Sequence, residues 1–510
     1  QLIFVPLALR DFDRHVELHA RSVAHGDPAH WAEVAFWGVG TITSGGSTVV
    51  TADYSRFRRR LILLGLGVVA LIAVVVATVL VVLRNDDATT PVAAAAASAQ
   101  LPDLGNATPV LAALSPDAPA PDPVALAAAL TPLLSSAALG TGVSAEVVDV
   151  ATGKTLFDQD GATPSTPAST AKLLTSAAVL TTLHPDDTLE TKVVAGSSPG
   201  EVVLVGGGDP TLSRTAPSKS YAGAPTMADL ATQVLAARPA GTPITSVVVD
   251  GSLYSGPLTA AGWEPGDAPS SYAAPVTATA VDGARVSPGS TARSGQPGLD
   301  AGSALADALG ARGATVVLGE APAGAKTLAT VHSAPISRLV EQALSMSDNM
   351  LAEALARQVA IARKLPASFE GSARAVIGAL TDAKIDVSGV TLHDGSGLSR
   401  DDRVPASVLT AVVSGAADDS LKGTSAILSG LPVAGYDGTL FDRGDAATAP
   451  GTVRAKTGTL LGVHALAGTV VTVDGRLLAF SVVADGSGSD AAAEAALDNV
   501  AAALAGCGCR

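Results

Sequence analysis

Ser169 and Lys172 form a Ser-x-x-Lys tetrad that could carry out nucleophilic chemistry. The tetrad leads into an apolar stretch at 177–180 whose composition suits a helix. If that helix begins near Ser169, three residues make almost one turn, so the lysine amine lies over the serine hydroxyl and can take its proton. The helix dipole would then favour the alkoxide. Taken alone, the tetrad is more typical of a capped amphipathic helix with a solvated lysine.

Two further motifs change this interpretation. The chain carries one Ser-x-Asn motif, Ser347-Asp348-Asn349, and then one Lys-Thr-Gly motif, Lys456-Thr457-Gly458. Each of the three motifs occurs once, in this order. Together they resemble the active-site motifs of the serine enzymes that recognise penicillin, the penicillin-binding proteins and the serine β-lactamases.

Length and charge narrow the range of functions. The chain has 510 residues, which allows two or three domains, and a formal net charge of −15. Its one basic block lies at 56–60, so we do not expect nucleic acid as a partner. No cluster of histidine, cysteine and carboxylate residues points to a metal site, and we expect no cofactor.

The N-terminal part has the pattern of a membrane anchor. Residues 61–83 carry no charged side chain and are long enough to cross a bilayer. The arginines before this span predict that residues 1–60 form a cytoplasmic tail, which we expect to be disordered. Residues 84–123 are rich in alanine and proline and predict a linker. The rest of the chain would therefore lie outside the cytoplasm, although the alanine run at 93–97 could hide a cleavage site.

Hydrophobic patterns beyond the linker predict a fold that mixes strands and helices. A helix is expected from Val124, and the pattern turns helical again over 336–356 and 491–504. A strand-rich and turn-rich region separates the first two motifs, so we expect an inserted domain at 187–334 in a catalytic domain formed by 124–186 and 335–510. Strands are expected at 144–149, 154–157, 191–194, 201–205, 245–249, 315–318, 452–455, 465–473 and 477–483.

From about Val124 to the C-terminus the sequence resembles the class C low-molecular-mass penicillin-binding proteins, the D-alanyl-D-alanine carboxypeptidase/endopeptidase family. Besides the three motifs, the stretches 206–212, 394–400 and 431–440 are similar to that family. The resemblance implies an α+β fold of the β-lactamase/transpeptidase type, an antiparallel sheet flanked by helices with a helical lobe. Val463-His464 departs from the small or hydroxyl residues expected there, and the insertion is shorter than is usual for the family.

The same resemblance implies a role for each motif residue. Ser169 would be the nucleophile and Lys172 its base, while Ser347 and Lys456 would pass the proton to the leaving amine. Asn349 would hold the peptide amide of the substrate. The oxyanion hole would consist of the backbone N–H groups of Ser169 and Thr459. The remaining implied contacts are with the terminal carboxylate of the substrate, and the residues expected there are Thr457, Gly458 and Thr459.

Three weaker patterns are better explained by structure than by chemistry. His393-Asp394 could suggest a Ser-His-Asp triad, but a tight loop near the active site is the better interpretation, since no nucleophile elbow presents a serine. Gly206-Gly207-Gly208 lacks the lysine of a phosphate loop and predicts a turn at a strand end. Cys507 and Cys509 could be oxidised outside the cytoplasm, but because so small a ring would be strained we expect a tail feature without chemistry.

These observations predict a membrane-anchored serine D-Ala-D-Ala carboxypeptidase/endopeptidase that acts on peptidoglycan stem peptides and is inhibited by penicillin. A β-lactamase is the alternative among enzymes, and it would differ by activating water to deacylate the enzyme. A non-catalytic module that senses penicillin or binds the cell wall is the alternative from another class, but such a module would not need Lys172.

Overall fold

The computed structural model describes residues 40–44, 47–51, 114, 117–443 and 450–509. Contacts divide the chain into two compact units, residues 1–108 and 109–510. In the first unit, β1 (Gly40–Ser44) pairs with β2 (Ser47–Thr51) in an antiparallel hairpin. This hairpin lies inside the segment for which disorder was expected.

The predicted membrane span at 61–83 lies outside the described residues, as do most of the tail and the linker. Among the helices that the structure does describe, none combines the length and the apolar character needed to span a bilayer.

A five-stranded antiparallel sheet organises the second unit. Its strand order is β12-β13-β14-β3-β4, so the first strands after the linker pair with the last strands of the chain. This arrangement confirms the strands that the sequence predicted on both sides of the motifs. The strands are β3 (Gly142–Asp149), β4 (Lys154–Gln159), β12 (Val453–Leu460), β13 (Val463–Val471) and β14 (Leu477–Asp485).

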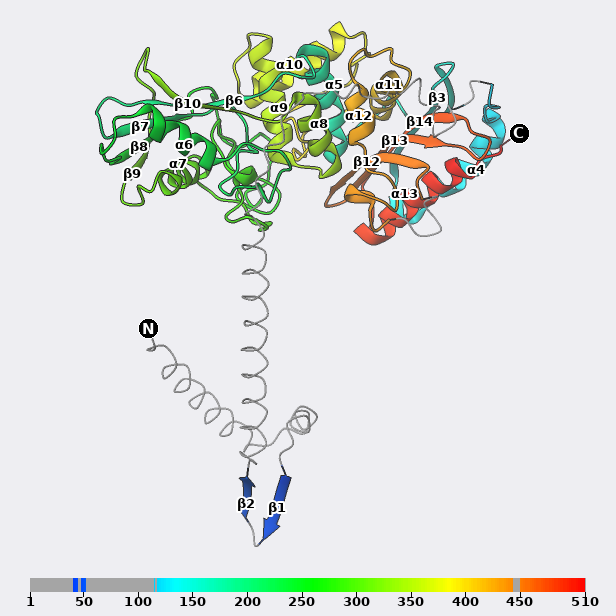
Figure 1. Cartoon of the computed structure of the whole chain (residues 1–510). Helices are drawn as coiled ribbons and strands as arrows, with labels where there is room; N and C mark the ends of the chain where they lie inside the picture. Colours follow the sequence, from blue (N-terminus) through cyan, green and yellow to red (C-terminus); the bar gives the residue numbers. More distant parts are fainter. Residues whose placement is uncertain (1–39, 45–46, 52–113, 115–116, 444–449, 510) are drawn as a thin grey trace, which may run out of the picture. The chain divides into compact units, whose positions relative to one another are not determined.

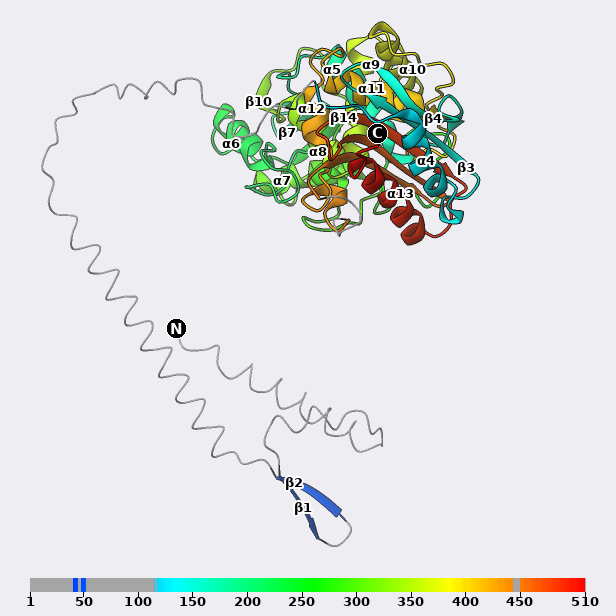
Figure 2. The same cartoon turned by 90° about the vertical axis from the view of Figure 1, so that its right-hand side faces the viewer.

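Helices cover both faces of this sheet. On one face, α4 (Pro123–Leu134) and α13 (Asp490–Ala505) pack together, as Figure 2 shows, and bury leucine and valine side chains against the strands. Asp122 caps α4 by accepting hydrogen bonds from the N–H groups of Val124 and Ala125. On the opposite face, α11 (Ala406–Ala417) contacts β14 and β3.

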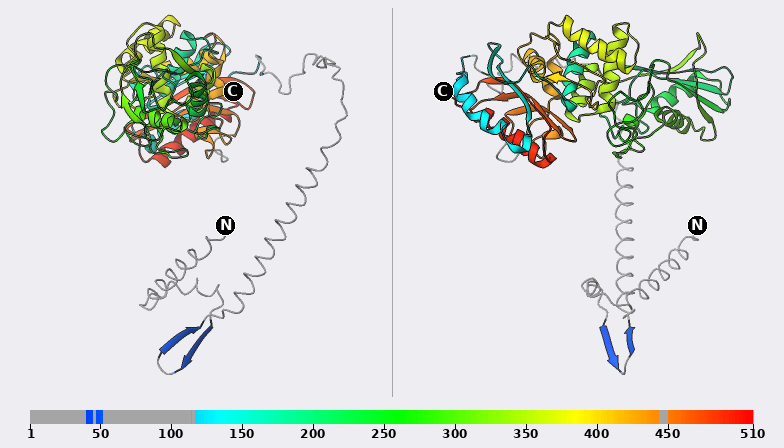
Figure 3. Two further views of the ribbon diagram at one scale, coloured as in Figure 1. Left: turned by 60° about the vertical axis from the view of Figure 1, so that its left-hand side comes forward. Right: turned by 180° about the vertical axis from the view of Figure 1, so that it is seen from behind.

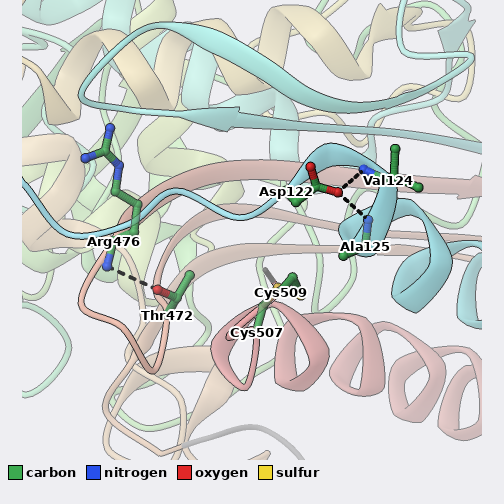
Figure 4. The surroundings of a disulfide bond; sticks show 7 residues. All are labelled: Asp122, Val124, Ala125, Thr472, Arg476, Cys507 and Cys509. Atoms are coloured by element: carbon green, nitrogen blue, oxygen red, sulfur yellow. Dashed lines mark hydrogen bonds between the residues drawn. A yellow bond between two sulfur atoms is a disulfide. The ribbon is translucent and has the colours of Figure 1, made fainter.

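The two cysteines close the C-terminal end of this layer. Cys507 and Cys509 form a disulfide, the oxidation that the sequence allowed but that ring strain argued against. Both cysteines pack against the apolar cluster beneath α4 and α13, and the backbone N–H of Asp122 donates to the carbonyl of Cys509 at 2.6 Å. Figure 4 shows the disulfide beside the start of α4. The end of the chain is thus fixed to the residue that begins the first helix.

A helical layer lies between this sheet and a second one, as Figures 1 and 3 both show. Its helices share a buried aliphatic core. They are α5 (Lys172–Thr182), α8 (Ile336–Ser345), α9 (Asn349–Ala362), α10 (Phe369–Asp382), α11 and α12 (Ser425–Gly430). Two two-residue strands, β5 (Pro164–Ser165) and β11 (Val404–Pro405), pair with each other nearby.

The predicted continuous helical run at 336–356 is interrupted. α8 ends at Ser345, and Ser347 has a left-handed backbone with a φ of 52°. α9 then begins at Asn349, because the side chain of Asp348 accepts a hydrogen bond from the backbone N–H of Leu351 and caps the new helix. The middle motif therefore lies in a sharp corner between two helices.

The second sheet has the order β10-β6-β7-β8-β9. The pairs β7–β8 and β8–β9 are parallel, so α6 (Met227–Ala237) and α7 (Pro297–Ala308) act as crossover helices that the sequence analysis did not anticipate. The expected strands of this region are confirmed. They are β6 (Glu190–Ala195), β7 (Glu201–Val205), β8 (Ser246–Asp250) and β9 (Thr315–Leu318), and β10 (Thr327–His332) completes the sheet.

Candidate active site

Ser169 lies in a short 3-10 turn, η4 (Ala168–Ala171), that runs directly into α5. This helical path places Lys172 nearly one turn after Ser169, and the lysine Nζ donates to Ser169 Oγ at 2.9 Å. Ala168 adopts a left-handed φ of 47°, a conformation that is strained for a residue with a Cβ. The backbone therefore turns sharply just before the serine.

Lys172 is held by three acceptors in a nearly dry environment. Its side chain is 1% exposed, and Nζ also donates to Asn349 Oδ1 at 2.6 Å and to the carbonyl of Ser396 at 2.7 Å. Burial lowers the pKa of Lys172 to about 8, although the charges of Asp394 and Glu353 oppose the shift. A lysine with this pKa can release its proton near neutral pH.

A second lysine approaches the site from the sheet. Lys456, on β12, is fully buried, and its Nζ donates to Ser347 Oγ at 2.9 Å and to the carbonyl of Thr457 at 2.9 Å. Burial and the nearby charge of Lys172 hold the pKa of Lys456 well below its usual value. Each lysine is thus paired with one serine hydroxyl.

These side chains meet in a cleft with a volume of about 670 Å³. Ser169 comes from η4, Asn349 from the start of α9, and Thr457 from β12. The Asn349 Nδ2 donates to the carbonyl of Tyr272 at 3.2 Å, which fixes the orientation of the amide. Of the residues that the motifs single out, the following line the cleft: Ser169, Ser347, Asn349, Thr457 and Thr459.

Gly458 lies behind the cleft wall, where β12 passes close to the serine turn. A Cβ at this position would lie 2.9 Å from the carbonyl oxygen of Pro167 and 3.1 Å from the Cβ of Ala168. Since real Cβ atoms almost never approach so closely, any side chain here would push the strand away from Ser169. Gly458 therefore sets the spacing between the Lys-Thr-Gly strand and the turn that carries Ser169.

The segment that begins at Asp394 forms a tight loop next to Lys172, as the sequence predicted. The Asp394 carboxylate accepts from the backbone N–H groups of Ser396 and Ser399, and from the indole N–H of Trp263 at 2.7 Å. Because these donors occupy the carboxylate, it is not available to a catalytic histidine. The loop instead presents the carbonyl of Ser396 to Lys172.

Buried acids behind this loop were not singled out by the sequence. Glu353, on α9, accepts from the backbone N–H of Gly395 at 3.0 Å and forms an ion pair with Arg357. Burial, together with the charge of Asp394, raises the pKa of Glu353 to about 7. The i, i+4 spacing of Glu353 and Arg357 was visible in the sequence, but it is also typical of an exposed helix surface.

A charged cluster from the segments that connect the strands of the second sheet holds the middle motif. Asp348 accepts from the Tyr221 hydroxyl at 2.7 Å, and Arg285 and Arg293 lie within 3.4 Å and 3.5 Å of its carboxylate. Burial alone would raise the pKa of Asp348, but the positive charges of the two arginines have the larger effect and lower this pKa to about 2. Since these partners are far from Asp348 in sequence, no local pattern could have identified them.

Val463 and His464, where the sequence differs from the family pattern, lie on β13 beside the cleft-lining strand β12. His464 faces Thr459 in the register of β12 and β13, and its Nδ1 lies 2.7 Å from the hydroxyl of Ser487. The ring is fully buried, so it supports the strand that carries Thr459. In the part of the chain that the structure describes, no group of three or more histidine, cysteine or acidic residues could hold a metal.

The turn at Gly206-Gly207-Gly208 ends β7, as predicted for a strand end. The N–H of Gly206 donates to the carbonyl of Asp250, and the N–H of Gly208 donates to that of Ala278. The backbone of this turn is therefore engaged by neighbouring segments and does not form a phosphate loop.

Comparison with known proteins places this geometry in a family. The model of the D-Ala-D-Ala carboxypeptidase 3 (S13) family matches residues 126–296 and 289–506. A carboxypeptidase of Mycolicibacterium smegmatis is 41% identical over 80% of this chain and 90% of its own length. A carboxypeptidase of Mycobacterium tuberculosis is 38% identical over 76% of this chain and 85% of its own length.

The fold is shared with a solved structure. Penicillin-binding protein 4 of Haemophilus influenzae superposes with a TM-score of 0.60, covering 73% of this chain and 97% of that chain at 23% identity. The chain thus has the α+β fold of that protein. From the match of the family model and the two mycobacterial relatives, this chain belongs to the S13 family and is a serine-type D-Ala-D-Ala carboxypeptidase.

Proposed function

We propose that the protein hydrolyses the terminal D-Ala-D-Ala bond of peptidoglycan stem peptides through an acyl enzyme on Ser169. The observation that carries this assignment is the hydrogen bond of 2.9 Å between Ser169 Oγ and the buried amine of Lys172. With a pKa of about 8, roughly a tenth of the Lys172 side chains are neutral at pH 7. At the ordinary lysine pKa that fraction would be smaller by a factor of a few hundred.

In the acylation step, neutral Lys172 takes the proton of Ser169, and Oγ attacks the carbonyl carbon of the penultimate D-alanine. The backbone N–H groups of Ser169 and Thr459 stabilise the oxyanion, where one donor typically contributes about 3–4 kcal/mol. The C–N bond then breaks as Lys456 and the hydrogen-bonded Ser347 pass to the leaving amine the proton that Lys172 took, so Lys172 is neutral again and Ser347 keeps its hydroxyl. D-alanine departs, and the peptide remains as an ester of Ser169.

Deacylation adds water to the ester and restores the free serine. The same lysine and serine groups can take the proton of the water and return it to Oγ. Asn349 holds the peptide amide, while the hydroxyls of Thr457 and Thr459 bind the terminal carboxylate near the amine of Lys456. The hydroxyl of Thr457 lies 2.8 Å from that of Thr439, which orients it.

Penicillin fits the same scheme, because its strained amide acylates the serine and the leaving nitrogen stays tethered. The Haemophilus influenzae protein of the same fold has been solved in complex with a β-lactam. We therefore expect penicillin to inhibit the enzyme by slow turnover at Ser169. Endopeptidase action on cross-linked stems would use the same residues.

We further propose that residues 61–83 anchor the chain in a membrane and that residues 84–123 tether an extracytoplasmic catalytic domain, into which 187–334 is inserted. The uncharged stretch and the arginines that precede it support this orientation. Extraction of membranes with alkaline carbonate should leave the protein in the pellet, whereas a chain without 61–83 should be released. Release of the intact chain would argue against the anchor.

The enzymatic proposal is tested by incubating the protein with a labelled penicillin and with an acyl-D-Ala-D-Ala peptide. We expect a stable adduct on Ser169 and release of D-alanine, with neither in Ser169→Ala. Ser176→Ala, on the same helix but outside the cleft, is the matched control and should behave as the parent. Fast penicillin hydrolysis without D-alanine release would identify a β-lactamase, and the absence of both reactions would identify a non-catalytic module.

A further inference from the structure

A second cavity, separate from the active site, lies where the parallel strands of the second sheet end. It has a volume of about 530 Å³, and it is bounded by residues that follow β8 and β9 and by the start of α7. The carboxyl ends of parallel strands are where open α/β sheets commonly bind ligands. Its walls are mostly aliphatic, with contributions from Val249, Leu258, Val276, Leu299 and Leu318.

The N-terminus of α7 opens into this cavity without a side-chain cap. Gln296, the N-cap residue, makes no capping hydrogen bond, and the N–H groups of Gly298 and Leu299 have no acceptor among the described residues. By contrast, α6, which packs on the same sheet, is capped by Thr226 and Asp229 in a capping box. An uncapped N-terminus presents free donors and a partial positive charge.

Thr279 supplies an independent sign that the cavity is built for a polar group. It is 3% exposed, it lines the cavity, and its hydroxyl has no hydrogen-bond partner in the described part of the chain. The hydroxyl points toward the uncapped turn, since a Cβ at Gly298 would lie 3.9 Å from Thr279 Oγ1. The hydroxyl is open to the cavity, so a ligand bound there can accept its hydrogen bond.

We propose that this cavity binds the terminal carboxylate of a short aliphatic peptide. The carboxylate would accept from the N–H groups of Gly298 and Leu299 and from the Thr279 hydroxyl, while small side chains occupy the aliphatic walls. Glu320, exposed at the rim, disfavours a ligand of higher negative charge such as a phosphate. The carboxylate of Asp250 is already occupied by the N–H groups of Ser252 and Ala321.

The position of the cavity suggests which peptide it binds. One segment lines both cavities, since Tyr272 faces the active site, while residues 275–277 and Thr279 face the second cavity. The carbonyl of Tyr272 also accepts from Asn349. We therefore infer that the peptide is an alanine-terminated stem peptide, a choice that rests on the proposed function. It would be held next to the active site, where other stem peptides are cleaved.

Binding can be measured with the active site blocked. The whole protein is first acylated with benzylpenicillin and its mass recorded, so that failure of the proposed function is seen as an unmodified mass before any peptide is added. N-acetyl-D-alanyl-D-alanine and its C-terminal amide are then titrated by calorimetry and by amide NMR. We expect saturable one-to-one binding of the acid, at least tenfold weaker binding of the amide, and shifts of the Gly298 and Leu299 signals.

Two variants test the contacts. Thr279→Val removes the hydroxyl at nearly constant shape, and Gly298→Ala places a methyl group where its nearest neighbour would lie 3.4 Å away, so both should fold. Thr279→Val should weaken binding about tenfold, which is the typical effect of losing one hydrogen bond. Gly298→Ala keeps the backbone N–H, but its methyl group would lie between the cavity-lining side chains of Leu318, Val249 and Thr279, and we expect it to weaken binding by narrowing the space for the carboxylate. Thr232→Val and Gly313→Ala, on α6 and in the turn before β9, are the controls and should bind as the parent does.

Any one of three results overturns the proposal. These are equal binding of acid and amide, undiminished binding in Thr279→Val and Gly298→Ala, and absence of saturable binding to the acylated protein. If the mass shows no acylation, the titration of the same protein still reports on Gly298 and Leu299 by NMR. Signals at those two residues that stay unchanged would overturn the second site alone.

Discussion

The pKa of Lys172 makes a quantitative prediction for the pH dependence of acylation. If the neutral amine is the base, the rate of penicillin acylation follows the fraction of Lys172 that has lost its proton. With a pKa of about 8, that fraction is about 0.5 at pH 8, about 0.1 at pH 7 and about 0.01 at pH 6. The rate should therefore fall about tenfold per pH unit below pH 7 and level off above pH 9.

The assay is rapid mixing with a fluorescent penicillin, from which the second-order acylation rate constant is taken between pH 5.5 and 9.5. Lys172→Gln keeps a polar side chain but no base, and it should show no acylation at any pH. Lys422→Gln is the control, since Lys422 lies on the exposed surface and pairs only with Asp419 among the described residues. Its profile should match that of the parent.

Two outcomes would refute the reasoning. A rate that is flat from pH 6 to 8 would mean that Lys172 is not the group whose deprotonation limits acylation. A rate that still rises about tenfold per pH unit up to pH 9.5 would mean that burial does not lower the pKa of the lysine. Circular dichroism at each pH excludes unfolding as the cause of a falling rate.

Three further substitutions probe contacts that support the site or the antiparallel sheet. Tyr221→Phe removes one hydrogen bond to Asp348 and should lower the free energy of unfolding by about 1–2 kcal/mol in denaturant titrations, and an unchanged midpoint would contradict the role of that contact. Gly458→Ala should slow acylation at least tenfold in the penicillin assay while the circular dichroism spectrum stays native, because the added Cβ would meet Pro167 at 2.9 Å. Arg476→Leu leaves the buried carboxylate of Asp149 without its two bonds of 2.6 Å, and thermal or urea unfolding should show a loss of about 3–5 kcal/mol. A loss below 1 kcal/mol would show that water replaces the guanidinium.

The acid stability of the protein should depend on Asp348. Its pKa in the folded state is about 2, below the ordinary value of 3.8, so its charge stabilises the fold above pH 3.8. That contribution is lost as the pH falls from 3.8 toward 2. The difference in urea midpoint between the parent and Asp348→Asn should therefore shrink over this interval. A difference that stays constant down to pH 2 would show that Asp348 titrates normally.

Local sequence was sufficient to predict the strands of the antiparallel sheet. β13 and β14 consist mainly of buried residues with aliphatic side chains, and turns at Gly462 and Gly475 separate them from their neighbours. Periodicity and turn residues specify such strands without reference to distant parts of the chain. Pairing order is different, because β14 pairs with β3 across most of the sequence and no local pattern specifies that contact. The resemblance to a family predicted an antiparallel sheet flanked by helices, but not its strand order.

The corner at Ser347 shows why sequence reasoning missed a break within a helical pattern. Apolar residues continue at helical spacing from α8 into α9, so periodicity alone predicts one helix. The cluster Ser345-Met346-Ser347-Asp348-Asn349 did hold a local signal, since serine, aspartate and asparagine favour helix caps. A capping analysis would have placed the start of α9 correctly.

What holds that corner could not be found locally. A left-handed backbone at Ser347 costs free energy, and the cost must be offset by contacts that fix the residues on either side. Asp348 provides them by capping α9 with one oxygen and accepting from Tyr221 with the other, while Arg285 and Arg293 balance its charge. Because three of these four partners lie between the first and second motifs, the region around the second sheet helps to position the serine that Lys456 contacts. Removal of that region should therefore impair acylation even though it contributes none of the three motifs.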